Sequence, residues 1–348
     1  MTKKYDKLVI LLGCAMVGLL LTGCGSRENV DLAMVKVSEL NYQEALELFD
    51  TAEEAGESEK LIARGRGITY MGMTRYEEAE KCFLDALNCS NGILEDMDYD
   101  INLYLAAVYT KQEKHAKAEE IYDAILALKP KEDDVKFLRG IARLKLSKYE
   151  QAKEDMDQVI AKNPKNYERV IEIYEAMEAA GHKEAGQGYL TDALQNYEEQ
   201  MDDFTKGRMY FYMGEYPKAY AALEEAKKDG GLEAYLYLGK AYESTGDYNY
   251  ASSVYNSYLA KEGEDARIYN QLGLCEMKKG EYANALAAFQ SGLKIEGNSM
   301  MQSLLFNEIA AYEYLSDFEK AKVLINKYLT MYPDDEKAIR EAGFLSTR

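Results

Sequence analysis

The stretch "AYLYLGKAYESTGDYNYASSVYNSYL", residues 234–259, combines large aromatic and apolar residues with two small ones, Gly239 and Ala251. Small side chains allow two helix axes to approach to about 8–10 Å, so these residues mark the crossing of two antiparallel helices, A and B. Neither helix can bury its apolar stripe alone, and the unit therefore needs neighbouring copies of itself.

Copies of this unit follow one another along the chain. The stretch "IYNQLGLCEMKKGEYANALAAFQSGL", residues 268–293, is a second clear copy, and others approximate the pattern x-Tyr-x-x-Ala. The aligned alanines are 32 to 39 residues apart, which is the period of a solenoid repeat. They are Ala45, Ala79, Ala118, Ala152, Ala185, Ala219, Ala251, Ala285 and Ala321.

The copies resemble tetratricopeptide repeats over about residues 26–335. The resemblance implies an all-α fold, a right-handed α-solenoid of about nine helix-turn-helix units within residues 24–335. It also implies that large residues four positions after the alanines, such as Phe83, Tyr255 and Phe289, pack into the next repeat. The small residues of helix A are expected at Gly67, Ala106, Gly140, Gly207, Gly239 and Gly273.

Some segments depart from the pattern. Repeat five, in "EAMEAAGHKEAGQGYLTDAL" (residues 175–194), and repeat nine, with Ile309 in place of a small residue, have registers that the sequence leaves open. The 39-residue spacing predicts a longer loop at residues 88–100. Residues 336–348 are expected to form a capping helix that shields the last repeat.

The N-terminus has the layout of a signal peptide, with three lysines followed by an apolar run at residues 8–23. This run is shorter than the roughly 20 residues that span a bilayer. Leu21-Thr22-Gly23-Cys24 resembles the bacterial lipobox, which implies removal of residues 1–23 and a diacylglyceryl group on Cys24. An uncleaved anchor and a plain secretory signal are the alternatives.

The composition limits the partners. A formal net charge of −19 argues against nucleic acid, because phosphate binding depends on clustered Lys and Arg. Beyond the leader and Cys24, the remaining cysteines are Cys82, Cys89 and Cys275, an odd set that does not form a disulfide framework.

Catalytic patterns are lacking, and we expect no enzyme, cofactor or metal site. His115 and His182 both lie three residues before an aligned alanine, where other copies carry Tyr, so they are expected to pack in the turn. Asp96, Asp98 and Asp100 imitate the start of a calcium loop, but Ile101 replaces the glycine that such a loop needs.

Binding is the remaining function, and the repeat register indicates where it occurs. In tetratricopeptide arrays helix A lines the concave surface, and a groove with aromatic walls and basic residues suits an extended peptide with acidic groups. Alternatively, Phe204 and Phe211 fill a gap between repeats. The residues that the resemblance places on this surface are Tyr174, Phe204, Arg208, Phe211, Tyr212, Lys240, Asn270 and Lys278.

The sequence thus predicts a membrane-anchored, extracytoplasmic scaffold for protein or peptide partners at the bacterial cell envelope. The alternative is an envelope receptor for glycans or small molecules, since lipoproteins of that type also carry such repeats. Those receptors stack sugars on Trp, which this chain lacks, although its 30 Tyr offer other stacking surfaces.

Overall fold

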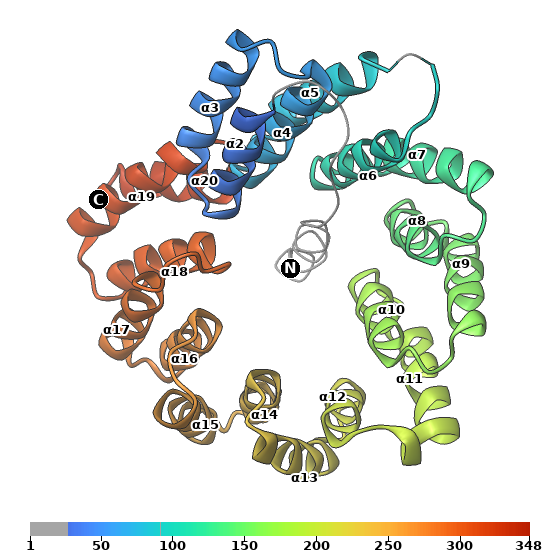
Figure 1. The fold of residues 1–348 in the computed structure, drawn as a ribbon. Coiled ribbons are helices and arrows are strands. Elements are labelled where there is room, and N and C mark those ends of the chain that lie inside the picture. The colour runs from blue at the N-terminus through green and yellow to red at the C-terminus, as the bar shows by residue number, and fades with distance from the viewer. Residues whose placement is uncertain (1–26, 91) are drawn as a thin grey trace. The chain divides into compact units, whose positions relative to one another are not determined.

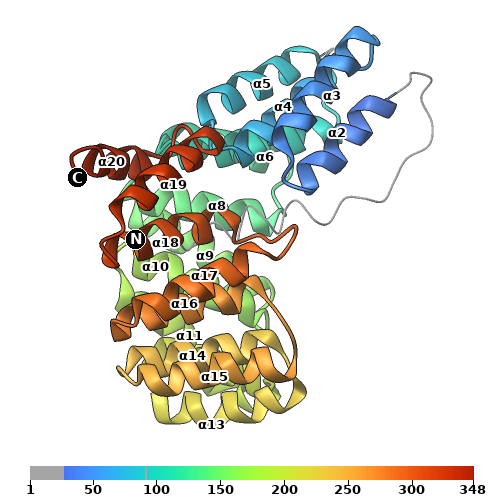
Figure 2. The ribbon, with the colours of Figure 1, turned by 90° about the vertical axis from the view of Figure 1, so that its left-hand side faces the viewer.

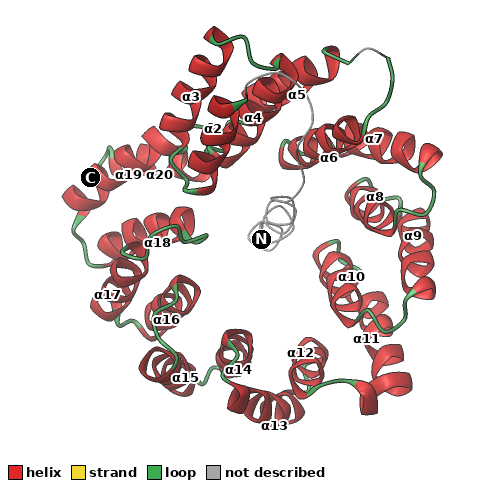
Figure 3. Cartoon of the chain, in the orientation of Figure 1, coloured by secondary structure: helices red, strands yellow, loops and turns green. Residues whose placement is uncertain are grey.

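The computed structural model describes residues 27–90 and 92–348, so the signal peptide and Cys24 lie outside the described residues. Within these residues the chain forms helices, turns and loops and no β-strand (Figure 3). The helices are α2 (Glu28–Ser38), α3 (Tyr42–Glu54), α4 (Glu59–Gly72), α5 (Tyr76–Asn88), α6 (Asp96–Lys111), α7 (His115–Leu128), α8 (Asp133–Lys145), α9 (Tyr149–Lys162), α10 (Tyr167–Ala179), α11 (Lys183–Tyr197), α12 (Asp203–Met213), α13 (Tyr216–Ala226), α14 (Leu232–Ser244), α15 (Tyr248–Lys261), α16 (Ala266–Lys279), α17 (Tyr282–Leu293), α18 (Met301–Tyr314), α19 (Phe318–Met331) and α20 (Glu336–Leu345).

Helices α2 to α19 form nine A–B hairpins in the described part of the chain, which confirms the predicted all-α solenoid. The chain divides into two compact units. Unit 1 contains the described residues up to Asn163 together with Glu175–Lys183, and unit 2 contains Pro164–Tyr174 and Glu184–Arg348. In unit 2, helices α13 to α18 are stacked along one direction (Figure 2).

The same turn joins helix A to helix B in all nine hairpins. One residue adopts a left-handed conformation, for example Gly246 with a φ of 83°. The next residue donates its backbone N–H to the carbonyl five residues earlier, as Asp247 does to Tyr242 at 2.9 Å. This is the Schellman arrangement that satisfies the last carbonyls of a helix. The donors are Asn41, Arg75, Lys114, Lys148, His182, Glu215, Asp247, Glu281 and Asp317.

This turn fixes the register of repeat five. The donor lies four residues before the aligned small residue in the other eight repeats, so the donor His182 assigns that position to Gly186. Gly186 is buried, whereas Ala185 is partly exposed. The alignment on Ala185 is therefore wrong by one residue. His182 has the turn position rather than the tyrosine position, and its ring stacks on Tyr149 with 4.2 Å between centroids.

Aromatic rings fill the space that the helix A glycines leave. A Cβ atom added to Gly239 would overlap the ring of Tyr255, which is fully buried and donates its hydroxyl to Glu243 at 2.5 Å. Phe289 lies over Gly273 in the same way. These rings therefore pack against helix A of their own repeat. The sequence predicted packing into the next repeat only, so that prediction was incomplete.

Repeat nine keeps the register but changes the residues. Ile309 takes the position of the helix A glycine, and Ile325 takes the position of the aromatic ring. Both are buried, so two branched side chains fill the space that a single ring fills in other repeats. Beyond this repeat, α20 buries Ala338 and Leu345 against the same core.

The insertion between repeats two and three is shorter than expected, because α5 ends at Asn88 and α6 already begins at Asp96. All three aspartates of this region lie in the first helical turns. Asp98 is buried and bound to Lys60 at 2.8 Å, and Asp100 pairs with Arg64 at 2.5 Å. Burial opposes the charge of Asp98, but hydrogen bonds from Lys60, Ser90 and the backbone N–H of Glu95 hold its pKa at about 2. The carboxylates stabilise the helix stack.

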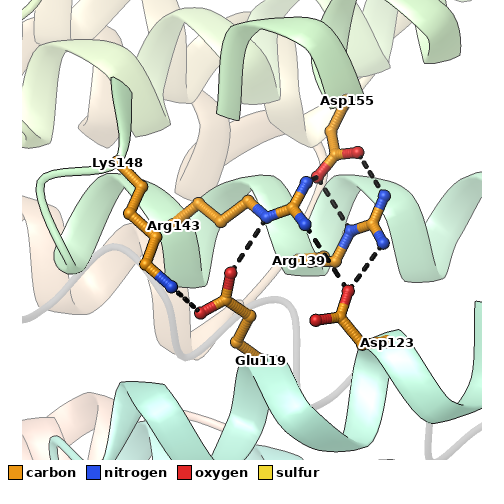
Figure 4. A network of polar contacts seen from close by, with 6 residues as sticks. All are labelled: Glu119, Asp123, Arg139, Arg143, Lys148 and Asp155. Carbon is orange, nitrogen blue, oxygen red and sulfur yellow. Dashed lines mark hydrogen bonds and ion pairs between the residues drawn. The ribbon is translucent and has the colours of Figure 1, made fainter. Parts of the chain in front are cut away.

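A buried charge network joins α7, α8 and α9 in unit 1 (Figure 4). Asp155, with 1% of its surface exposed, accepts two hydrogen bonds from Arg139 at 2.6 and 3.0 Å and a third from Arg143 at 2.8 Å. Glu119 accepts from Arg143 at 3.1 Å and from Lys148 at 2.6 Å. Burial raises the pKa of Glu119, but these two cations more than offset it and lower the pKa.

The equivalent place one repeat earlier is apolar. Leu105, Tyr109 and Ile121 stand at the repeat positions of Arg139, Arg143 and Asp155, and they line an open cleft of about 420 Å³ between α5, α6 and α7. One structural position thus accepts either apolar residues or a complete set of paired charges.

Over the described ranges, none of the helices is both long and apolar enough to cross a membrane.

Candidate functional site

The A helices of unit 2 form one layer and the B helices another (Figure 1). Contacts join α12 to α14, α14 to α16 and α16 to α18, so side chains from successive A helices meet on a shared face. We call it the A face.

Aromatic side chains gather at its start. The ring of Phe211 lies 5.1 Å from that of Tyr212 and 5.7 Å from that of Tyr237, measured between centroids. Phe204 packs edge-on against Tyr237 at 5.9 Å. The hydroxyls of Tyr212 and Tyr237 share a hydrogen bond of 3.0 Å. Phe204, Phe211, Tyr212 and Tyr237, with Arg208, are called the A-face cluster below.

Arg208 holds this cluster together from within. Its guanidinium lies 5.4 Å from the centre of the Phe204 ring and 5.0 Å from that of Tyr237. Both terminal nitrogens bind the carboxylate of Glu168 on α10, one of them at 2.9 Å. Burial opposes the charge, but this carboxylate and the tyrosine hydroxyls raise the pKa of Arg208. Arg208 is therefore a permanent cation with an internal partner.

Tyr174 does not line the surface. The corrected register gives it the small-residue position of helix A in repeat five, and it is 1% exposed. Its ring packs 5.2 Å from that of Tyr212. Tyr174 supports the A-face cluster from below.

The other predicted residues lie further along the A face. Lys240 on α14 places its ammonium 5.1 Å from the centre of the Tyr237 ring. Asn270 on α16 is buried and accepts a hydrogen bond of 2.8 Å from Asn307. Lys278, also on α16, is exposed. The structure thus joins Lys240 to the A-face cluster but gives Asn270 a packing role.

Glu168 and Tyr237 are parts of the site that the sequence prediction missed. When repeat five is aligned on Gly186, Glu168 occupies the same position within its repeat as Glu233 and Arg267 do in theirs. Those two side chains form an ion pair between α14 and α16, at 2.5 Å. The glycine of the turn, Gly181, carried the signal for this register.

The half-buried rings of Phe204 and Phe211 offer apolar surface in the A-face cluster, where Lys240 lies over the ring of Tyr237. Lys278 is an exposed cation further along the same face. Aromatic surface next to cations suits a segment with both apolar and acidic groups. Among the residues that the structure describes, no group of three or more His, Cys, Asp or Glu side chains is placed to hold a metal ion.

Comparison with protein families matches tetratricopeptide repeat models to residues 64–133 and 244–298, and a second model of this repeat to residues 134–166. These segments are tetratricopeptide repeats. Repeats of this class form scaffolds for protein interactions and are generally non-catalytic.

Two curated relatives share part of their length with this chain. Human RNA polymerase II-associated protein 3 is 25% identical over 218 residues, 57% of this chain and 32% of the relative. Bovine BBSome complex member BBS4 is 19% identical over 311 residues, 86% of this chain and 59% of the relative. The chain thus spans less than two thirds of each relative.

Solved structures are similar in fold. Yeast Tom70 superposes with a TM-score of 0.52 at 14% identity, covering 92% of this chain and 80% of Tom70. A tetratricopeptide repeat protein from Parabacteroides merdae gives a TM-score of 0.45 at 14% identity, covering 83% of this chain and 99% of that protein. The likeness to Tom70 concerns the fold alone.

Proposed function

We propose that this chain is a lipid-anchored scaffold that binds an acidic peptide segment of an envelope protein on its A face. The observation that carries the proposal is the half-buried pair Phe204 and Phe211 in a cluster whose Tyr237 ring carries Lys240. Lys278 adds an exposed cation further along the A face, on α16. Cys24 supplies the anchor in this proposal.

The physical basis is a division of roles on the A face. Aromatic side chains that are already packed lose little freedom on binding and serve as anchors for a partner. Lys240 and Lys278 are cations on the A face of a chain whose net charge is −19, and such cations attract acidic segments and set their position. Arg208 is less available for this role, since its side chain is only 12% exposed and bound to Glu168. Lys278 is the better probe.

Lys278→Glu is expected to reduce the amount of partner crosslinked to the protein in membranes several-fold, with a melting temperature close to that of the wild type. Lys278 is exposed, so the charge reversal leaves the packing of the A-face cluster intact. The loss should shrink at high salt, because the contribution of a rim charge is screened. Quantitative mass spectrometry of crosslinked partners measures both effects.

Lys294→Glu is the matched control, because Lys294 is also exposed and follows helix B of the same repeat. It should leave the partner set unchanged. If both variants lose the partner equally, the A face is not the binding surface. Quenching of Tyr fluorescence by oligosaccharides in the purified protein would instead favour the glycan receptor.

Cys24→Ala is expected to release the protein from the membrane fraction or to leave an unprocessed precursor, since stable attachment depends on acyl chains on this thiol. Fractionation followed by N-terminal mass analysis distinguishes the two. Cys89→Ala is the control, because Cys89 is an exposed cysteine within the repeats and should keep the protein anchored. A Cys24→Ala protein that stays in the membrane with the wild-type N-terminus would refute the lipid anchor.

A further inference from the structure

Three tyrosines form a continuous stack beside the A–B turn of repeat seven. The ring of Tyr220 on α13 lies 4.4 Å from that of Tyr242 on α14, with an angle of 14° between the ring planes. Tyr250 on α15 follows at 5.4 Å and 22°. The hydroxyl of Tyr220 is held by Thr245 at 2.9 Å. The stack is therefore fixed at one end and ends at Tyr250 on the other.

Tyr250 is 64% exposed, which is unusual for so large an aromatic side chain. Two carboxylates, those of Glu224 and Asp247, lie near Tyr242, the middle ring of the stack. Burial first, and then the charge of Glu224 and Asp247, raise the pKa of Tyr242. Glu224 also pairs with Lys227, whereas Asp247 is exposed and its side chain does not cap α15.

Elsewhere in the chain, tyrosine rings commonly carry a cation of their own. Arg75 lies 4.7 Å from the centre of the Tyr70 ring, and Lys129 lies 3.7 Å from that of Tyr99. In the part of the chain that the structure describes, none of the three stacked rings has a Lys or Arg over its face. Rings with an internal cation include Tyr70, Tyr99, Tyr104, Tyr109, Tyr197, Tyr210, Tyr235, Tyr237 and Tyr312.

We propose that the Tyr220–Tyr242–Tyr250 stack is a docking site for an arginine side chain of a partner protein. The guanidinium lies over the exposed ring of Tyr250, and the carboxylate of Asp247 accepts its hydrogen bonds. The partner segment is basic, which complements both the two carboxylates near Tyr242 and the net charge of −19.

The planar order of the stack favours arginine over lysine. A guanidinium is flat and weakly hydrated, so it continues a series of parallel rings, whereas an ammonium is a compact and strongly hydrated charge. The electron-rich faces of the rings attract the cation in either case.

This site is separate from the A-face cluster in residues and in sign of charge. A partner with an acidic and a basic segment could use both, but neither site requires the other. The stack can therefore bind arginine even if the A face binds no peptide.

The test uses a fluorescein-labelled hexaarginine peptide and the purified chain, with binding followed by fluorescence anisotropy at 0.15 M salt. Tyr250→Leu removes the ring without changing the charge and should weaken binding about three- to fivefold, the effect of an exposed cation–π contact. Phe344→Leu is the control, because Phe344 is 41% exposed but its ring already carries Arg348 at 4.8 Å. It should bind like the wild type.

A second pair of variants separates the site from general attraction to an acidic protein. Asp247→Asn and Asp229→Asn each remove one exposed carboxylate, and Asn is accepted at the helix start that Asp247 occupies. Only Asp247→Asn should weaken binding. Equal losses in these two variants, unchanged binding by Tyr250→Leu, or tighter binding of hexalysine than of hexaarginine would overturn the proposal.

Discussion

Gly239→Leu is expected to lower the free energy of unfolding of repeat seven by about 3 kcal/mol, at the upper end of the cost of overpacking a core. Even a Cβ atom at this position overlaps the ring of Tyr255. The ring has little room to move, because it is fully buried and its hydroxyl is bound to Glu243. The crossing of α14 and α15 must therefore open.

Hydrogen exchange resolved by segment measures this loss, since each repeat of a solenoid is stabilised mainly by its neighbours. Protection should fall in α14 and α15 and persist in distant repeats. Gly188→Leu is the matched control, because Gly188 is an exposed helical glycine with open space around it. That change should stabilise the chain by about 0.5–1 kcal/mol. Uniform loss of protection along the whole chain would contradict the solenoid.

Much of the fold could be predicted because the crossing of two helices demands small residues at fixed positions. Gly207, Gly239 and Gly273 all lie beneath a large side chain of their own repeat, and the alanines twelve residues later are buried. The resemblance implied that the large side chains pack into the next repeat, but they also pack against helix A of their own repeat. Phe83, for example, lies over Gly67 of its own repeat and also stacks on Tyr104 of the next.

The register of repeat five failed for a traceable reason. Ala185 matches the residue type of the aligned position, and Gly186 beside it is equally small. The turn would have decided between them, because the left-handed residue is Gly214, Gly246 or Gly280 in the next three repeats and Gly181 here. A glycine with positive φ is a stronger marker of register than an alanine, since few residues adopt that conformation without strain.

Only part of the candidate site could be predicted from the sequence, because Tyr174 and Asn270 are buried and the ion pair of Arg208 was not foreseen. Phe204, Arg208 and Phe211 all lie on α12 and gather around the ring of Tyr237. The partner of Arg208 could not be read from the sequence, because Glu168 lies 40 residues earlier and the one-residue error moved it off the A face. Pairing between side chains of successive repeats is not part of the repeat pattern.

The charge network of repeat four was equally hidden. Acidic side chains on a helix are usually solvated, and nothing local marks Asp155 as buried. The signal lies in the comparison of repeats, since Ile121 holds the same position in repeat three. A carboxylate at a position that is otherwise apolar indicates a compensating cation on the facing helix, here Arg139.

Asp155→Ala is expected to destabilise the region of α7, α8 and α9 by about 3–5 kcal/mol, the cost of removing one partner from a buried ion pair. Asp155 accepts hydrogen bonds from both Arg139 and Arg143, whose side chains are 17% and 14% exposed. Without it, Arg143 keeps Glu119, but Arg139 keeps only Asp123, whose side chain is 50% exposed. A largely buried guanidinium would then be left undercompensated.

The control for this change lies two residues further along the same helix. Asp157 is 49% exposed and pairs with Lys153, so Asp157→Ala should cost less than about 1 kcal/mol, as for a surface ion pair. A triple variant, Arg139→Leu with Arg143→Tyr and Asp155→Ile, copies the apolar residues of repeat three and should recover much of the lost stability, because well-packed apolar residues replace buried ions at little cost. Segment-resolved hydrogen exchange of α8 measures all three proteins. If Asp155→Ala is no more harmful than Asp157→Ala, the network does not stabilise this repeat.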